Sequence, residues 1–491
     1  MRYQEKFASV VGYLTIAFFL CTGLALAVTA IQPFWLDEWF IIQNLKFRTA
    51  EALWGQLEYM QQFPRLYLQI LKVITDTFDY SYGSLRLPSF AVHTLGVLLC
   101  IHIGKKIFKT SATALFTFVL VYISFKTSLD YFVQVKQYTM EMLLGLVAMW
   151  QMMSIQKILT RGRLSMLHWI LLYLSMAAVT FFSYTYPILV VSMLYVIVMR
   201  RITKKDDAVP DRYNPHIPLL IILSTASVAS FYIYDVTYVM HDDGMQGYWK
   251  EYIMKDGFSA KLFFGNIYKL FAHQGAGALF ETTFGILGIA GWLLGLYSFR
   301  KHVKSSEPGE LMVAYATVVV AAMVILFAAG KLPLGVHRLN AFATPLLALL
   351  SINFLLWVQE NARMKTAVNV LLSVLLLALA GNVFSSVIDK MTNDDTKKKS
   401  AIYDQVSDCI IKAQEQKLPV FVHRNIAYPS DIHPEVTGDW VLETLPAYDT
   451  RIMLPLHPVN DRSEVEALMS TQKKSAAMYI AADACEIIST D

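Results

Sequence analysis

Charged residues are scarce in this chain. Asp, Glu, Lys and Arg make up 16% of its 491 residues, whereas 55% of the residues are hydrophobic. The mean hydropathy is +0.44. Soluble globular proteins contain about 45–50% apolar and about 25% charged residues. The composition therefore excludes an ordinary soluble globule and predicts a polytopic membrane protein.

Motifs for several kinds of chemistry are also lacking. No basic patch interleaved with aromatic residues occurs, so we expect no nucleic-acid partner. No HExxH, CxxC, P-loop or GxGxxG stands in a context where it would have meaning. Cysteine is rare, with four in the chain, and Cys21 and Cys100 in apolar runs are explained by packing. For Cys409 and Cys485 we predict a disulfide in an oxidising compartment, with Cα atoms within about 7 Å.

Long apolar runs are abundant. Eleven are candidates to cross a bilayer. They cover residues 7–31, 87–104, 111–125, 138–155, 167–183, 186–199, 217–236, 278–298, 311–330, 339–357 and 365–387. The first run carries no charge and is too long for a signal-peptide core, so we expect a retained anchor. An odd number of spans places the two termini on opposite sides.

The short loops indicate the orientation. Eighteen Lys and Arg residues lie in one alternate set of loops, at 2–6, 105–109, 157–163, 200–212, 300–304 and 363–365. By the positive-inside rule this face is cytoplasmic, and the opposite face is extracytoplasmic. Lys390 and the lysines at 397–399 oppose this assignment, because they follow the last span on the outer side.

Two outer segments and the C-terminal segment differ from the spans in composition and hydrophobic pattern. Residues 40–86 have amphipathic helical spacing and are expected to lie along the membrane surface. The aromatic-rich loop 237–277 either covers a lipid-facing groove or lies at the interface. We divide the chain into a transmembrane domain, residues 1–387, and a small extracytoplasmic α/β domain, residues 388–491. In that domain we expect helices at 400–416 and 463–470 and strands at 419–423 and 476–481.

Two adjacent carboxylates, Asp37 and Glu38, follow the first span in Ile31-Gln-Pro-Phe-Trp-Leu-Asp-Glu-Trp-Phe40. They therefore lie at a membrane surface. Aromatic residues favour that depth and acids favour the starts of helices, which gives a purely structural explanation. Ionisable groups near lipid are costly, however, and for that reason usually mark a functional site.

Basic residues follow on the same face. Arg86 lies at the outer entrance of the second span. A non-catalytic explanation is that its side chain extends to a lipid phosphate. If residues 134–141 are helical, Lys136, Tyr138 and Glu141 enter the fourth span together, either as a functional group or as a structural ion pair.

The shortest outer loop contributes two more residues. His337 and Arg338 lie in it, just before the tenth span. A lone His is usually structural, whereas Arg is suited to phosphate.

The order of these features resembles the GT-C class of membrane glycosyltransferases, in the branch of the protein O-mannosyltransferases and aminoarabinose transferases. The resemblance covers roughly residues 1–350. Its matching elements are Asp37-Glu38, the Pro64 and Tyr67 region, Leu85-Arg86-Leu87-Pro88-Ser89, Lys136-Gln-Tyr138, and Arg338 before a span containing Pro345. The sequence departs at Phe63, where the family often has His, and at Arg65, where it often has a second Pro.

The resemblance implies an all-α membrane fold of about eleven transmembrane helices with amphipathic outer helices. It also implies transfer of a sugar from a polyprenyl-phosphate carrier to an extracytoplasmic glycan, lipid or protein, with inversion. Asp37 would act as the base, and Glu38 would orient it, share a divalent metal or hold the acceptor. Arg86, Lys136 and Arg338, with Arg65 and His337 behind them, would stabilise the leaving phosphate. Tyr67, Tyr138 and Glu141 are candidate substrate contacts. No cofactor is required, and a divalent metal is allowed but not implied.

Two other classes of function remain open. A transporter or flippase of a lipid-linked saccharide would also want acids and arginines inside its spans. Against it stand the absence of an evident internal repeat and the clustering of charged candidates on one face. A non-catalytic membrane scaffold whose C-terminal domain binds a partner is the third. Replacing Asp37 with Asn distinguishes these classes of function, because only an enzyme would lose turnover in a purified assay.

Overall fold

The computed structural model of the protein describes most of the chain, and its contacts divide the chain into two units. The described residues are 2–29, 34–59, 61–109, 111–161, 164–203, 216–239, 252–254, 259–272, 277–361, 364–392, 394–424, 443–449, 451–481 and 485–489. The helical unit comprises Met1–Gly23, Ser89–Phe132 and Gln137–Val387. The composite unit comprises Leu24–Pro88, Val133–Lys136 and Ile388–Asp491. Residues 24–88 and 133–136 thus group with the C-terminal segment by their contacts.

Some residues used in the sequence analysis lie outside the described part of the chain. They are Ile31, Gln32, Pro33, Arg163, Lys204, Lys205 and Arg212, the stretches 240–251, 255–258 and 273–276 of the loop 237–277, and Arg363.

Over the residues that the structure describes, each of the eleven apolar runs lies mostly in a helix. Among the described residues, nine helical stretches are long and apolar enough to cross a membrane. They belong to α1 (Arg2–Val28), α4 (Tyr82–Phe108), α7 (Tyr138–Arg161), α9 (Tyr186–Thr203), α10 (His216–Phe231), α13 (Ala278–Tyr297), α15 (Pro308–Ala328), η5 (His337–Ala343) with α16 (Thr344–Asn361), and α17 (Lys365–Thr392). The other two runs form the shorter helices α5 (Ala112–Ser124) and α8 (Met166–Ala178) with η2 (Val179–Phe182). The chain is a multi-pass membrane protein, as predicted.

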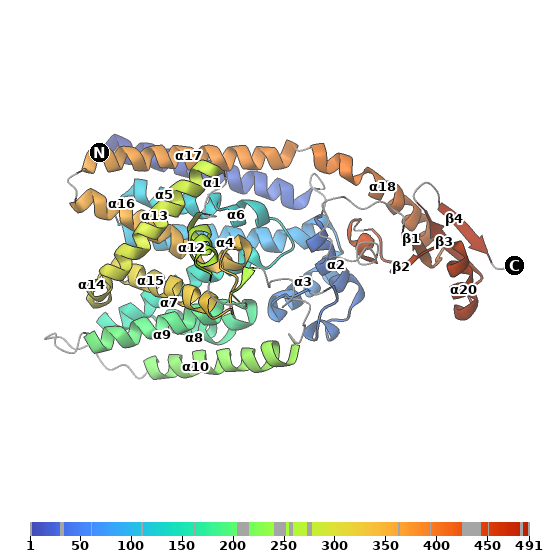
Figure 1. Cartoon of the computed structure of the whole chain (residues 1–491), viewed down its shortest axis with the longest axis horizontal. Helices are drawn as coiled ribbons and strands as arrows, with labels where there is room; N and C mark the ends of the chain where they lie inside the picture. Colours follow the sequence, from blue (N-terminus) through green and yellow to red (C-terminus); the bar gives the residue numbers. More distant parts are fainter. Residues whose placement is uncertain are drawn as a thin grey trace. The chain divides into compact units, whose positions relative to one another are not determined.

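In the helical unit α7, α9, α10 and α15 run in nearly the same or opposite directions (Figure 1). A helix satisfies its own backbone hydrogen bonds, which is what an apolar segment needs in lipid. Small residues allow close approach between helices. A Cβ on Gly291 would lie 2.1 Å from the Leu350 carbonyl oxygen where α13 crosses α16, and one on Gly145 of α7 would lie 2.1 Å from the Phe342 oxygen of η5. These contacts fix η5, which begins with His337 and Arg338.

Shorter elements connect the spans. In the helical unit these are α6 (Lys126–Tyr131), η3 (Tyr232–Val239), α12 (Ala260–Ala272) and α14 (Phe299–Lys304). In the composite unit α2 (Leu36–Phe47), η1 (Ala52–Trp54) and α3 (Arg65–Phe78) fill the expected surface segment. Leu68 and Leu71 of α3 are buried whereas Val73 and Phe78 are exposed. None of the described helices in this segment before α4 qualifies as a span.

The C-terminal segment forms the predicted α/β arrangement. Its elements are α18 (Asp394–Glu415), β1 (Val420–His423), η6 (Leu445–Ala447), β2 (Leu456–Val459), α20 (Arg462–Gln472), β3 (Ala476–Ile480) and β4 (Cys485–Ser489). The sheet has the order β2-β1-β3-β4, in which β1 is parallel to β2 and β3, and β4 is antiparallel to β3. The sequence predicted four of these elements and missed η6, β2 and β4.

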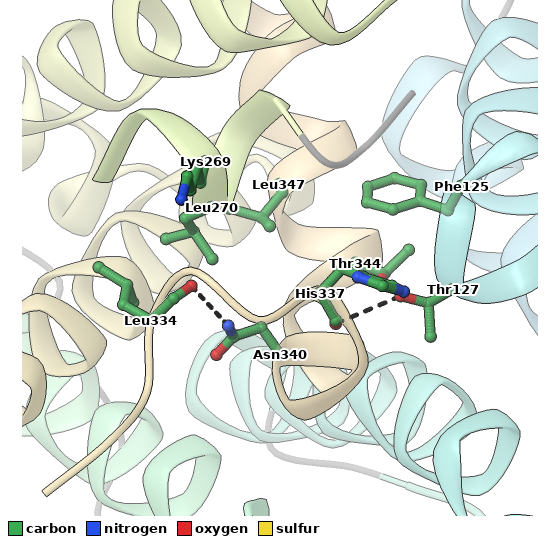
Figure 2. A pocket seen from close by; sticks show the side chains of 9 residues that line it. All are labelled: Phe125, Thr127, Lys269, Leu270, Leu334, His337, Asn340, Thr344 and Leu347. Carbon is green, nitrogen blue, oxygen red and sulfur yellow. Dashed lines mark hydrogen bonds between the residues drawn. The ribbon is translucent and has the colours of Figure 1, made fainter. Parts of the chain in front are cut away.

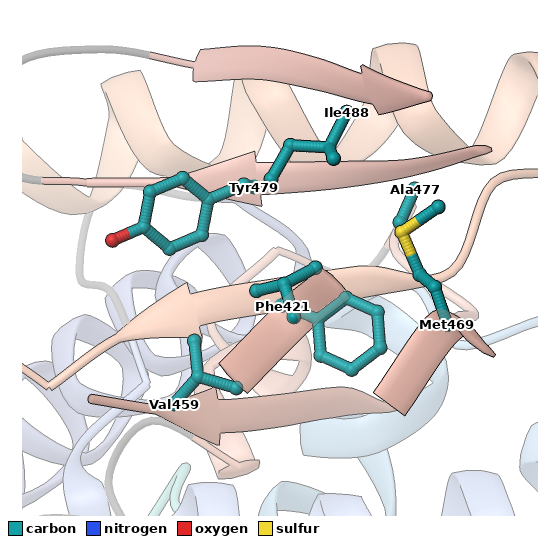
Figure 3. Packing of buried hydrophobic residues seen from close by; sticks show 7 residues of the cluster. Phe421, Val459, Met469, Ala477, Tyr479 and Ile488 are labelled. Carbon is teal, nitrogen blue, oxygen red and sulfur yellow. The ribbon is translucent and has the colours of Figure 1, made fainter. Parts of the chain in front are cut away.

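Apolar side chains on one face of this sheet form a core with α20. Phe421, Val459 and Tyr479 of the sheet pack with Val465 and Met469 of α20 (Figure 3). A disulfide joins Cys409 of α18 to Cys485 of β4, with their Cα atoms 6.1 Å apart. This spacing is normal for a disulfide.

The C-terminal segment also contacts the first outer segment. Within the composite unit η6 packs against α2, the helix that carries Asp37 and Glu38. Two elements in contact cannot lie on opposite sides of a membrane. The C-terminal segment is therefore on the same side as the acid pair, in spite of its lysines.

Candidate active site

The acid pair begins helix α2. Asp37 and Glu38 lie in its first turn, where the positive end of the helix dipole favours carboxylates. The Glu38 side chain reaches back to the start of the helix, where its Oε2 accepts a hydrogen bond of 2.9 Å from the Trp35 backbone N–H. Such a capping arrangement satisfies an N–H group that the helix cannot pair internally.

Glu38 also joins α2 to two distant parts of the composite unit. Its Oε1 accepts a hydrogen bond of 2.8 Å from the Val135 backbone N–H, and its Oε2 lies 3.8 Å from Nη2 of Arg86. The Glu38 and Arg86 side chains are each only 1% exposed. Of the roles that the sequence left open for Glu38, this geometry favours that of holding Asp37 in place.

Asp37 is the more accessible acid. Its side chain is 27% exposed, and its Oδ2 lies 3.9 Å from Nζ of Lys136. The buried Lys136 ammonium donates a hydrogen bond of 2.9 Å to Oε1 of Gln61. The structure therefore brings together Asp37, Glu38, Arg86 and Lys136, and adds Gln61, which the sequence analysis did not single out.

Lys136 reaches Asp37 because the chain before α7 is not helical. The helix begins at Tyr138, and the Lys136 N–H donates to the Gln134 carbonyl in a turn. The helical spacing considered for residues 134–141 is therefore wrong. Lys136 pairs with Asp37, whereas Glu141 of α7 accepts hydrogen bonds from the hydroxyls of Ser183 and Thr185.

Aromatic rings hold the Arg86 guanidinium. Its Cζ lies 4.5 Å from the centre of the Phe34 ring and 5.2 Å from that of Tyr82. The two rings are nearly parallel and stack at 4.5 Å. Cation–π contacts of this kind stabilise a buried cation and fix its plane. Phe34 and Tyr82 flank the acid pair and Arg86 in the sequence, which is the only signal that pointed to them.

The other candidates of the composite unit lie on α3. Arg65 and Tyr67 lie in its first turn after Pro64, and they are 2% and 1% exposed. The Tyr67 ring stacks on Phe63 at 5.4 Å. Burial of these residues supports a role for the helix as a wall of the unit.

His337 belongs to a second cluster, in the helical unit. Its Nε2 lies 3.7 Å from Oδ2 of Asp130, and its ring is 6.2 Å from that of Tyr131. Tyr131 in turn meets Tyr138 edge to face at 4.6 Å. Arg338 follows His337 in η5 and is partly exposed.

A pocket opens beside His337 (Figure 2). Its polar lining is Thr127, Lys269, His337, Asn340 and Thr344, and its apolar lining is Phe125, Leu270, Leu334 and Leu347. The Asn340 side-chain amide donates a hydrogen bond of 2.7 Å to the Leu334 carbonyl oxygen. The Thr127 hydroxyl donates one of 3.2 Å to the His337 carbonyl oxygen. These two hydrogen bonds fix the loop before η5. Lys269, from the aromatic-rich loop, was not among the sequence candidates.

A metal site receives little support from these donors. Within the described part of the chain no group of three or more His, Cys, Asp or Glu residues could hold a metal ion. Both oxygens of Glu38 already accept backbone hydrogen bonds, with which a metal shared with Asp37 would compete.

Neither a protein-family model nor a curated protein sequence matches the chain. Several solved structures match its fold, among them two of the same protein. ArnT from Cupriavidus metallidurans bound to undecaprenyl phosphate matches with a TM-score of 0.54 and 13% identity, over 95% of this chain and 92% of that one. The same protein in the apo state matches with a TM-score of 0.55 and 12% identity, over 95% of this chain and 92% of that one. The chain thus has the GT-C fold that the order of its motifs predicted. At 12–13% identity the likeness to ArnT concerns the fold alone.

Proposed function

We propose that this protein is a membrane glycosyltransferase that moves a sugar from a polyprenyl-phosphate carrier to an extracytoplasmic acceptor, which is a glycan, a lipid or a protein. The observation that carries the proposal is the arrangement around Asp37. One partly exposed carboxylate, Asp37, lies 3.9 Å from the buried cation Lys136. The neighbouring acid, Glu38, is buried and lies 3.8 Å from a second buried cation, Arg86. The fold shared with ArnT, which has been solved with undecaprenyl phosphate, supports the choice of carrier.

In the proposed reaction an acceptor hydroxyl attacks the anomeric carbon of the donor sugar. The new glycosidic C–O bond forms as the bond between that carbon and the phosphate oxygen breaks. The Asp37 carboxylate accepts the hydroxyl proton, and the lipid phosphate leaves with the electron pair of the broken bond. A single displacement of this kind inverts the configuration of the anomeric carbon.

Negative charge grows on the phosphate as it leaves. Fixed cations that meet this charge stabilise the transition state more than the ground state. Arg86 is suited to this task because its guanidinium is held next to the rings of Phe34 and Tyr82, with its Cζ 4.5 and 5.2 Å from their centres. Lys136, Arg65, His337 and Arg338 are further phosphate ligands in the proposal, and Tyr67, Tyr138 and Glu141 are further substrate contacts.

We place the reaction at the outer face of a bacterial cytoplasmic membrane. The argument is the positive-inside rule applied to the short loops, of which Lys105, Lys106 and Arg300 are examples. The composite unit carries the acid pair and the C-terminal disulfide, and a disulfide is expected in an oxidising compartment.

The test is turnover by the purified protein in detergent or nanodiscs with a panel of undecaprenyl-phosphate-linked sugars. Release of undecaprenyl phosphate and formation of the product are followed by mass spectrometry. Asp37→Asn should lower turnover by roughly 10²–10⁴-fold, the usual contribution of a general base. Binding of undecaprenyl phosphate should persist in this variant, because Arg86 and Lys136 remain.

The alternative is a flippase of a lipid-linked saccharide, and the same preparation distinguishes it. A flippase would move a labelled carrier between the leaflets of a vesicle and would have no turnover to lose on replacement of Asp37. Full retention of transfer activity in Asp37→Asn would refute the base assignment.

A further inference from the structure

Helix α2 is anchored at the end opposite to its acid pair. Lys46 lies in the last turn of the helix, and its side chain is buried, with 7% of the residue exposed. Its Nζ donates hydrogen bonds to three backbone carbonyls of the C-terminal segment. These are the carbonyls of Pro446, Asp449 and Ile452, at 3.0, 3.2 and 2.8 Å.

An ammonium group has three N–H donors that point in three directions. Described carbonyl oxygens of η6 and of the residues after it lie within hydrogen-bond distance of these donors. A guanidinium carries its donors in one plane and cannot converge on the same three acceptors. This is a site built for lysine.

Further contacts support the same junction. The Trp39 ring meets Tyr448 edge to face at 5.8 Å, and the Tyr448 hydroxyl donates a hydrogen bond of 2.6 Å to Oδ1 of Asp404 on α18. On the other side, Lys72 and the Tyr80 hydroxyl donate to the Leu45 carbonyl at 2.8 and 2.7 Å. The C-terminal turn of α2 is thus held from two directions.

The charged groups around Lys46 come from several elements. Asp449 on the C-terminal turn and Asp79 before α4 attract its ammonium, and the Nζ lies 5.8 Å from the centre of the Tyr80 ring. Lys72 is 5.8 Å from the same ring and pairs with Asp76 at 2.8 Å. Burial outweighs the two attractive acids and lowers the pKa of Lys46 to about 8.

We propose that Lys46 is a positioning residue, through which the C-terminal segment fixes helix α2 and thereby the place of Asp37 at the other end of the helix. Nine residues of helix separate the two side chains, a length of roughly 13–14 Å at 1.5 Å per residue. Over that length a small tilt of the helix displaces its first turn by about 1 Å, and a displacement of this size costs about 10²-fold in rate. This inference rests on the proposed glycosyltransferase function.

The experiment uses the full-length protein and a graded series at one position. Lys46→Gln keeps two donors and Lys46→Met keeps none, whereas Lys46→Arg keeps the charge but not the geometry. Arg462→Met is the matched control, because Arg462 pairs with Glu466 and Glu486 on the same C-terminal domain. Amide hydrogen exchange of residues 36–47 reports the anchor, and steady-state kinetics with the lipid-linked donor report the position of Asp37.

Exchange in α2 should become faster in the order Lys, Gln, Met, and kcat should fall by about 10–100-fold in Lys46→Met. The Kd for undecaprenyl phosphate should stay within about twofold, and Lys46→Arg should restore kcat only in part. A role limited to folding would lower the yield and the Tm without this separation of kcat from binding. If Lys46→Met does not accumulate, the Gln and Arg variants carry the same comparison.

Three outcomes show separately whether the Lys46 anchor or the proposed glycosyltransferase function fails. Unchanged exchange in Lys46→Met overturns the anchor, and faster exchange with unchanged kcat overturns its link to Asp37. A wild-type protein without any turnover counts against the proposed function, and the exchange measurements still test the anchor in that case.

Discussion

Glu38 and Arg86 form a buried ion pair, in which the Glu38 Oε2 lies 3.8 Å from the Arg86 Nη2 and both side chains are 1% exposed. Removing one partner of such a pair leaves a buried charge without compensation and costs about 3–5 kcal/mol. In this protein the pair also ties the start of α2 to the start of α4. The acid pair is therefore divided in its roles, with one carboxylate holding the structure and the other exposed to substrate.

The first prediction follows from that division. Glu38→Ala should lower the free energy of unfolding by roughly 3–5 kcal/mol, because the buried Arg86 loses the Glu38 carboxylate and the N–H groups of Trp35 and Val135 lose this acceptor. Asp37→Asn should change it by less than about 1 kcal/mol, because its side chain is partly exposed. Thermal and denaturant unfolding in detergent measures both. Equal losses in the two variants would contradict the division of roles.

The second prediction concerns the pocket beside His337. Lys269 lines this pocket and forms no hydrogen bond or ion pair with any residue that the structure describes. If His337 contacts the donor phosphate as proposed, Lys269→Met should weaken binding of undecaprenyl phosphate by roughly tenfold, the size of one charged hydrogen bond. Lys261→Met is the matched control, because Lys261 is an exposed lysine on the same helix, α12.

Binding of undecaprenyl phosphate is measured at low and high salt. The loss in Lys269→Met should shrink at high salt, since salt screens exposed charges. An equal loss in both lysine variants would show a general effect of charge and would remove Lys269 from the pocket's function.

The third prediction concerns the disulfide between Cys409 and Cys485. These residues are separated by 76 positions, and opening a loop of this length costs about 4 kcal/mol in the chain-entropy description. Reduction, or replacement of both cysteines with Ser, should lower the unfolding temperature of the C-terminal domain. Mass spectrometry of the protein from intact membranes, alkylated before lysis, checks the bond. Free thiols at both positions would place this segment in a reducing compartment.

The fourth prediction is a pH dependence. The pKa of Lys46 lies at about 8 in the folded protein, below its usual value of 10.5, because burial disfavours the charged ammonium. Between these values the unfolded chain binds the proton and the folded chain does not, so stability rises as the pH rises. Relative to Lys46→Met, the wild type should gain up to roughly 3 kcal/mol from pH 8 to 10.5, at 1.36 kcal/mol per unit.

Below about pH 8 the difference in free energy of unfolding between the wild type and Lys46→Met should be constant. Denaturant unfolding at a series of pH values, with both proteins in the same detergent, measures it. A wild-type advantage that falls with pH over this range would mean that the three carbonyls raise the pKa of Lys46 instead.

Much of the architecture could be predicted from local patterns. Apolar runs of sufficient length become helices because in lipid the backbone N–H and C=O groups must pair within the segment. The described residues of all eleven predicted runs lie mostly in helices. Alternation and turn residues predicted β1 and β3 of the C-terminal domain, whereas β2 was missed because it contains Pro458 and a partly exposed face. The position of the acid pair at the start of a helix was also visible in the sequence.

The partners of the site residues were not visible in the same way. Lys136 was expected to share a helix side with Glu141, but a turn at residues 134–137 directs it to Asp37 instead. Asp37 and Glu38 are adjacent acids with the same first-turn environment in the sequence. Only the packing of α2 against Arg86 and Val135 makes one of them buried and the other accessible.

By itself the sequence determined a multi-pass helical protein with an acid pair at the exit of its first span and a small α/β domain at its end. These properties depend on local composition and periodicity, which act over a few turns of chain. The tertiary structure decided which acid is accessible. It also decided which carbonyls accept hydrogen bonds from Lys46, among them that of Pro446, 400 positions away in the sequence. Contacts over such separations depend on how whole elements pack, and no local pattern encodes them.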